Sequence, residues 1–141
     1  LSCLYFLIYH FINTQTKKVH YSRAGHCPVL YYHKNQDSIE YLKDKGIALG
    51  MVRNKSYGNF IQANEFGYHS GDIMVLYTDG ITEAKDKKGE EFGYDRLMQI
   101  LLEVKTLDPR QIQEELINRL YEFSGTRNIN DDYTTMIIKF K

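Results

Sequence analysis

An apolar run that ends in a carboxylate and a glycine is the feature that most constrains this chain. Residues 73–76 read Ile-Met-Val-Leu, and Tyr77-Thr78-Asp79-Gly80 follow. A short continuous apolar run before a turn signal predicts a strand buried on both faces. Gly80 has no Cβ, so the backbone can turn sharply there and another group can approach closely. The run therefore predicts a buried strand with Asp79 at its end, where the side chain can point out of the sheet.

A second acidic pair precedes another strand-like run. Asp131-Asp132 stand directly before residues 134–140, Thr-Thr-Met-Ile-Ile-Lys-Phe. Acidic residues at the ends of two strands in one small domain can supply the oxygen ligands that a hard cation such as Mg²⁺ or Mn²⁺ needs. Each pattern also has a plainer interpretation, because Asp-Gly is a common turn and an acidic pair often sits in a solvated loop. The residues alone leave both interpretations open.

Composition narrows the class of protein. The 141 residues are enough for one domain, and 43% hydrophobic with 26% charged residues is ordinary for a globular chain. The formal net charge of zero gives no support for binding to nucleic acid or an acidic membrane. No apolar run reaches the roughly 18 residues that a spanning helix needs. The two cysteines, Cys3 and Cys27, do not form a disulfide framework, so we expect a reducing, cytoplasmic location.

The order of periodic segments predicts an α+β fold. The first half contains strand patterns, among them residues 4–12, 19–23, 29–32, 39–42 and a weaker strand or strand pair over 59–68, joined by short polar turns that favour antiparallel pairing. The second half contains helix patterns over 92–104 and after Asp108. Asp108 is a good N-cap, Pro109 fits the first turn, Gln111 completes a capping box, and Gly125 can end the helix. We expect a single domain over residues 1–141.

Five segments, in order, resemble the signatures of one family. They resemble its AGHxPxLL, GxxLG, GD…LYTDGxxEA, FGxxRL and DDxT motifs at residues 24–31, 46–50, 71–84, 92–97 and 131–134. The resemblance covers about residues 5–139 and is to the SpoIIE/RsbU-like branch of the metal-dependent protein phosphatases (PPM, type 2C).

The resemblance implies an antiparallel β-sandwich flanked by helices, with two Mn²⁺ or Mg²⁺ ions at one edge. A metal-activated water would attack phosphoserine or phosphothreonine, with no covalent enzyme intermediate. Asp79 matches the metal ligand of the TDG motif, and Asp131 matches the metal-binding first acid of DDxT. Asp132 would occupy an outer position beside the ligands or serve as an alternative ligand. Typical substrates of the family are phosphorylated anti-sigma-factor antagonists, and a sensor domain usually lies upstream.

The chain departs from the family in one respect. The family's other metal-binding aspartates lie upstream, whereas residues 1–36 contain no Asp or Glu. We therefore expect a C-terminal portion of the domain, with little or no activity by itself. The alternative is a truncated or degenerate, non-catalytic module that binds protein partners. An uncovered sheet edge also invites pairing with another chain, so the aromatic run over residues 4–11 predicts a possible homodimer.

Overall fold

The computed structural model describes residues 7–52, 55–127, 129 and 131–141. Its elements, in chain order, are β1 (Leu7–Asn13), β2 (Lys18–Ala24), β3 (Val29–His33), β4 (Ser38–Leu42), the 3₁₀ helix η1 (Lys55–Phe60), β5 (Ala63–Gly67), β6 (Ile73–Tyr77), α1 (Asp79–Thr82), α2 (Gly93–Val104), α3 (Pro109–Ser124) and β7 (Thr135–Lys139). Every pairing of neighbouring strands is antiparallel, in the orders β1-β2-β5 and β4-β3-β6-β7.

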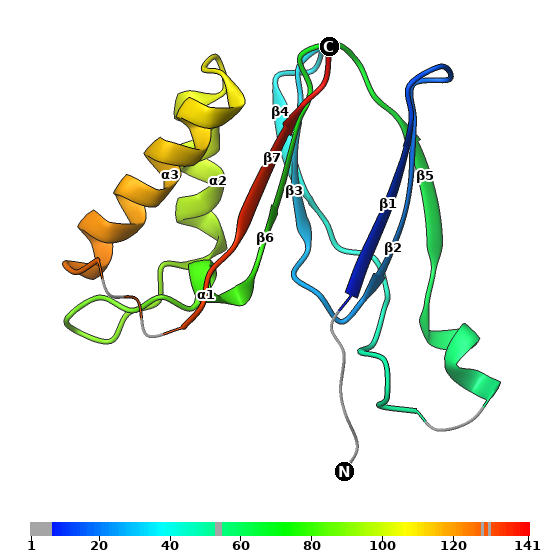
Figure 1. The fold of residues 1–141 in the computed structure, drawn as a ribbon, viewed down its shortest axis with the longest axis horizontal. Coiled ribbons are helices and arrows are strands. Elements are labelled where there is room, and N and C mark those ends of the chain that lie inside the picture. The colour runs from blue at the N-terminus through cyan, green and yellow to red at the C-terminus, as the bar shows by residue number, and fades with distance from the viewer. Residues whose placement is uncertain (1–6, 53–54, 128, 130) are drawn as a thin grey trace.

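The described residues form three layers (Figure 1). Helices α2 and α3 cover one face of the four-stranded sheet, and the three-stranded sheet lies on its other side. This is the predicted α+β sandwich, with helices on one flank of the described part. No helix in the described ranges is long and apolar enough to cross a membrane.

The central strands β3 and β6 are buried on both faces, which explains their continuous apolar runs. Leu30 and Val75 pack into a cluster with the helices, whereas Tyr31 and Met74 pack between the two sheets. Each strand thus divides its side chains between two cores by simple alternation. The prediction that residues 73–76 form a buried strand is confirmed.

Helix α3 begins and ends where the sequence predicts. Asp108 accepts a hydrogen bond from the backbone N–H of Gln111, and the Gln111 side chain accepts one in return, which completes the capping box. Pro109 opens the helix, and Gly125 ends it in the left-handed region with φ of 67°. The buried side chains along one face of α3 pack against the four-stranded sheet and α2.

Three boundaries differ from the sequence prediction. Residues 4–6 of the first predicted strand, and Cys3, lie outside the described residues, and β1 runs to Asn13. The segment 59–68 holds one strand, β5, preceded by η1, because the polar, glycine-containing stretch before it forms a helical turn. Asp79 is not a strand residue: β6 ends at Tyr77, and Asp79 begins α1.

Candidate metal centre

The carboxylate of Asp79 stands at the start of a single helical turn. Thr78 precedes it with extended backbone angles (φ −92°, ψ 162°), and the chain then turns into α1. The carbonyl of Asp79 accepts the N–H of Glu83 at 2.8 Å, which closes the turn. The backbone of Asp79 is therefore fixed, while its side chain is exposed to solvent.

Gly80 lets the acidic pair approach this turn. A Cβ at Gly80 would lie 2.5 Å from the carbonyl oxygen of Asp132 and 3.1 Å from its carbonyl carbon. Both are backbone atoms, so a side chain at this position would push the 131–134 segment away from α1. The expectation that another group approaches Gly80 closely is confirmed, and that group is the second acidic motif.

Two threonines join the acidic motifs through the backbone. Thr78 donates its N–H to the carbonyl of Thr134 at 3.1 Å, and its hydroxyl oxygen accepts the N–H of Thr134 at 2.9 Å. These bonds extend the β6–β7 ladder by one pair beyond the strands. Sequence reasoning missed this role, although both threonines lie inside the quoted motifs.

The carboxylates of Asp79 and Asp131 are only partly engaged. Oδ1 of Asp79 accepts the N–H of Gly80 at 3.1 Å, and Oδ1 of Asp131 accepts the N–H of Asp132 at 2.8 Å. Across residues 7–52, 55–127, 129 and 131–141, Oδ2 of each has no hydrogen-bond partner. Both side chains are exposed, as is that of Asp132. These three carboxylates are therefore hard oxygen donors that face solvent.

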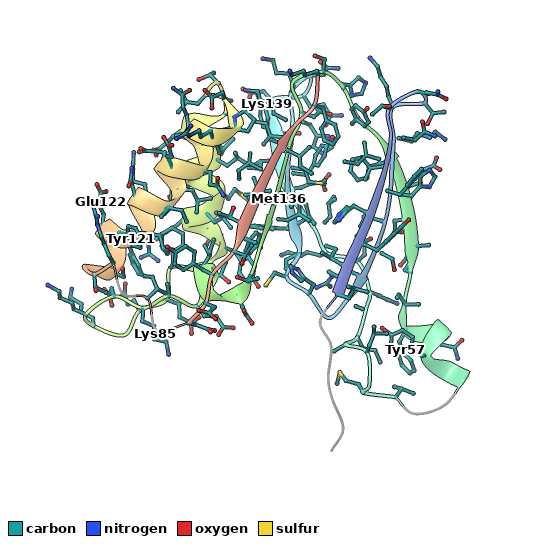
Figure 2. The ribbon with its side chains drawn as sticks, in the orientation of Figure 1. Tyr57, Lys85, Tyr121, Glu122, Met136 and Lys139 are labelled. Carbon is teal, nitrogen blue, oxygen red and sulfur yellow. The ribbon has the colours of Figure 1, made fainter. Side chains whose placement is uncertain are left out.

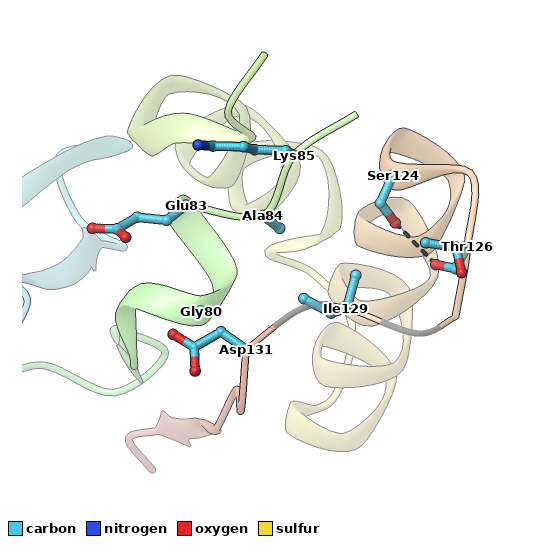
Figure 3. A pocket seen from close by; sticks show the side chains of 8 residues that line it. All are labelled: Gly80, Glu83, Ala84, Lys85, Ser124, Thr126, Ile129 and Asp131. Atoms are coloured by element: carbon cyan, nitrogen blue, oxygen red, sulfur yellow. Dashed lines mark hydrogen bonds between the residues drawn. The ribbon is translucent and has the colours of Figure 1, made fainter. Parts of the chain in front are cut away.

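A cavity of about 230 Å³ opens beside these groups. Gly80 and Asp131 line it together with Glu83 and Lys85, and Figure 3 shows the Asp131 carboxylate next to the α1 turn. Ala84 and Ile129 add apolar surface, and Ser124 and Thr126 border the α3 side. Among the described residues that line the cavity, Lys85, labelled in Figure 2, is the only one with a positive charge.

These carboxylate oxygens are the type of ligand that hard divalent cations such as Mg²⁺ and Mn²⁺ favour. The part of the chain that the structure describes groups no three His, Cys, Asp or Glu side chains as a metal site. These residues thus supply two carboxylates from two motifs, with Asp132 adjacent. The assignment of Asp79 and Asp131 as ligands stays a prediction.

The nearby cysteine is a poor nucleophile. Burial raises the pKa of the Cys27 thiol, and the carboxylates of Asp79 and Glu83 raise it further. A protonated thiol attacks phosphate poorly. The turn before it is structural: Gly25 has φ of 77°, and a Cβ there would lie 2.8 Å from the backbone nitrogen of Ala48.

The aspartate of the GD motif also has a structural role. Asp72 is 1% exposed and lies before β6. Its carboxylate accepts the hydroxyl of Tyr31 at 2.9 Å and the backbone N–H groups of Lys34 and His69, both at 2.8 Å. It therefore secures the start of β6, the strand that ends two residues before Asp79.

Comparison with known proteins identifies the family. The family model for Stage II sporulation protein E (SpoIIE) matches residues 2–141. The chain belongs to the SpoIIE family. This agrees with the resemblance carried by the five motifs.

Two curated relatives place the chain within longer SpoIIE-family proteins. It is 26% identical over 135 residues to phosphoserine phosphatase RsbU of Bacillus subtilis, which covers 96% of this chain and 38% of RsbU. It is 30% identical over 139 residues to protein IcfG of Synechocystis sp., which covers 96% of this chain and 20% of IcfG. The chain thus spans well under half the length of either relative.

Solved structures share the fold. The SiaA-PP2C domain of Pseudomonas aeruginosa has a TM-score of 0.79 at 18% identity, over 96% of this chain and 52% of that domain. A Bacillus subtilis structure of the SpoIIE PP2C phosphatase domain with a fragment of its regulatory domain has a TM-score of 0.77 at 19% identity, over 96% of this chain and 37% of that one. The predicted fold class, a partial type 2C phosphatase-like sandwich, is confirmed.

Proposed function

We propose that this chain is the C-terminal portion of a metal-dependent serine/threonine protein phosphatase domain, with Asp79 and Asp131 as ligands of Mn²⁺ or Mg²⁺. One observation carries the proposal. The Thr78–Thr134 bonds and the contact at Gly80 hold the two acidic motifs against each other, with exposed carboxylates beside a cavity.

The residues of this chain have separable roles in such a site. Bound divalent ions would lower the pKa of the attacking water and neutralise charge on the phosphoryl oxygens. Asp79 and Asp131 would supply hard oxygens to those ions, and Asp132 would lie beside them or replace one.

The relatives support the reaction and the cofactor. RsbU is named a phosphoserine phosphatase. Two solved structures with the same fold are a SpoIIE phosphatase domain presoaked with Mn and RsbX in complex with magnesium. We extend phosphoserine or phosphothreonine hydrolysis and a divalent ion to the whole domain to which this chain belongs.

The proposed substrate is a phosphorylated regulatory protein of the anti-sigma-factor antagonist type, and a sensor domain would precede the phosphatase domain. A related mycobacterial chain, Rv1364c, contains both RsbU and RsbW domains, which supports action on a partner in such a pathway. The missing ligands would come from sequence upstream of this chain. By itself, the chain would therefore be inactive or nearly so.

The test is Mn²⁺-dependent hydrolysis of p-nitrophenyl phosphate. The assay uses this chain, the longest natural protein that contains it, and the Asp79→Asn variant of each. We expect turnover in the longer protein only, and its loss in the variant. Turnover in the longer protein that survives Asp79→Asn would contradict the ligand assignment. Asp79-dependent turnover by this chain would show that two motifs suffice or that a second copy completes the site.

A further inference from the structure

A second hollow, separate from the cavity at Asp131, lies where the four-stranded sheet meets the start of α2. It has a volume of about 600 Å³ and is lined by Arg23, Pro28, Tyr41, Lys43, Tyr94, Asp95 and Met98. These residues come from β2, the loop before β3, the end of β4 and the first turns of α2. We call this hollow the β4–α2 groove.

Two cations, Arg23 and Lys43, line the groove, and neither has a carboxylate partner among the residues that the structure describes. Arg23 donates to the backbone carbonyls of Asp44 and His26, the latter at 2.7 Å, and neutral carbonyls do not cancel its charge. The Lys43 ammonium lies 5.9 Å from the ring centroid of Tyr41. Neither makes a salt bridge within the described ranges. Asp95 is the only acid among the described lining residues, so these side chains carry a net positive charge.

The rest of the lining is a rigid aromatic and apolar platform. The rings of Tyr41 and Tyr94 meet edge to face with centroids 5.3 Å apart. The Tyr41 hydroxyl donates to the carbonyl of Tyr94 at 2.7 Å, which ties the sheet to the start of α2. Tyr94 is nevertheless 43% exposed, and Met98 and Pro28 extend the apolar surface. An exposed aromatic side chain held by a buried one, beside an arginine, is typical of protein-binding surfaces.

The groove adjoins the candidate metal centre. Helix α1, which begins at Asp79, packs against α2, and Tyr94 is the second residue of α2. Glu83 follows the α1 turn that begins at Asp79 and also lines the cavity beside Asp131. A polypeptide whose phosphoserine reaches the two aspartates would therefore lay its flanking residues along the groove.

We propose that the β4–α2 groove determines substrate specificity by binding the segment of the phosphoprotein that flanks its phosphoserine. The complementary segment carries an acidic side chain for Lys43 and Arg23 and an apolar side chain for the Tyr41–Tyr94 platform. This inference rests on the proposed phosphatase function and identifies the sequence around the phosphoserine as the feature that the domain recognises.

The test measures peptide binding without catalysis. Fluorescein-labelled phosphoserine peptides carry Glu and Leu, Lys and Leu, or Gln and Ser in the flank, and fluorescence anisotropy reports their affinity for the metal-free chain. We expect the Glu–Leu peptide to bind most tightly. Lys43→Glu should weaken it by roughly three- to tenfold, the size expected when an exposed attraction becomes a repulsion. Tyr94→Ser should weaken all Leu peptides.

Lys45 provides the matched control. It is exposed, two residues from Lys43, and does not line the groove. Lys45→Glu makes the same change in net charge and should leave the preference for the Glu–Leu peptide intact. Equal effects of Lys43→Glu and Lys45→Glu, or no preference among the peptides, would overturn the proposal.

A kinetic arm separates this inference from the proposed function. In the longest natural protein that contains the chain, Lys43→Glu should raise KM for the Glu–Leu phosphopeptide and leave turnover of p-nitrophenyl phosphate unchanged. Loss of both activities in the Lys43→Glu variant alone would contradict a docking role. Absence of p-nitrophenyl phosphate turnover in the unmodified protein would instead contradict the phosphatase proposal.

Discussion

Gly80→Ala is the sharpest structural perturbation of the candidate metal centre. The added Cβ would meet the carbonyl oxygen of Asp132 at 2.5 Å and Cα of Tyr133 at 3.4 Å, so the backbone of the second acidic motif must move. Overpacking of this kind costs about 1–3 kcal/mol. Alanine is the better helix former by up to about 1 kcal/mol, which offsets part of that cost in α1.

We therefore expect Gly80→Ala to lower the free energy of unfolding by roughly 1–2 kcal/mol, measured by urea denaturation. This corresponds to a Tm lower by roughly 3–8 °C for a chain of this size. Gly58→Ala is the control, because a Cβ at Gly58 has no heavy atom within 4 Å. A Gly80→Ala chain as stable as the Gly58→Ala chain would refute the argument that the motifs are in contact here.

Three further perturbations test other parts of the structure. Asp72→Ala would leave a buried hydroxyl and two N–H groups without an acceptor, so we expect a loss of about 3 kcal/mol by urea denaturation; a loss below about 1 kcal/mol would contradict this role. Burial, and then the neighbouring His26, lower the pKa of His10, so its protonation opposes folding. Stability should therefore fall as the pH drops below about 6.5, the ordinary histidine pKa, and His10→Phe should flatten that part of the pH profile; an unchanged profile would contradict it. The exposed side chains on β1, 52% at Leu7, 58% at Tyr9 and 50% at Phe11, predict self-association; light scattering should show a dimer that Tyr9→Glu weakens, and a monomer at all concentrations would contradict it.

Local signals in the sequence predicted much of the fold. The capping box at Asp108 and the stop at Gly125 are encoded within a few neighbouring residues, so both were predictable. The continuous apolar run over residues 73–76 predicted burial on both faces. The division of seven strands into two sheets was less accessible, because β2 pairs with β5 across about forty residues of intervening chain.

The candidate site was only partly readable. The family resemblance indicated Asp79 and Asp131, but not what brings them together. That role belongs to Thr78 and Thr134, whose backbone pairing depends on the register of β6 and β7. The short helix α1 was also missed, because four residues are too few to show helical periodicity.

Paramagnetic broadening by Mn²⁺ in ¹⁵N NMR spectra of this chain tests whether Asp79 and Asp131 lie at one divalent metal site. We expect the resonances of residues 78–84 and 131–134 to broaden first. We also expect Asp79→Asn or Asp131→Asn to abolish this pattern, while Asp86→Asn, four residues after the end of α1, preserves it. Broadening centred elsewhere, or an unchanged pattern in the Asp79→Asn and Asp131→Asn chains, would contradict a shared metal site at these two aspartates.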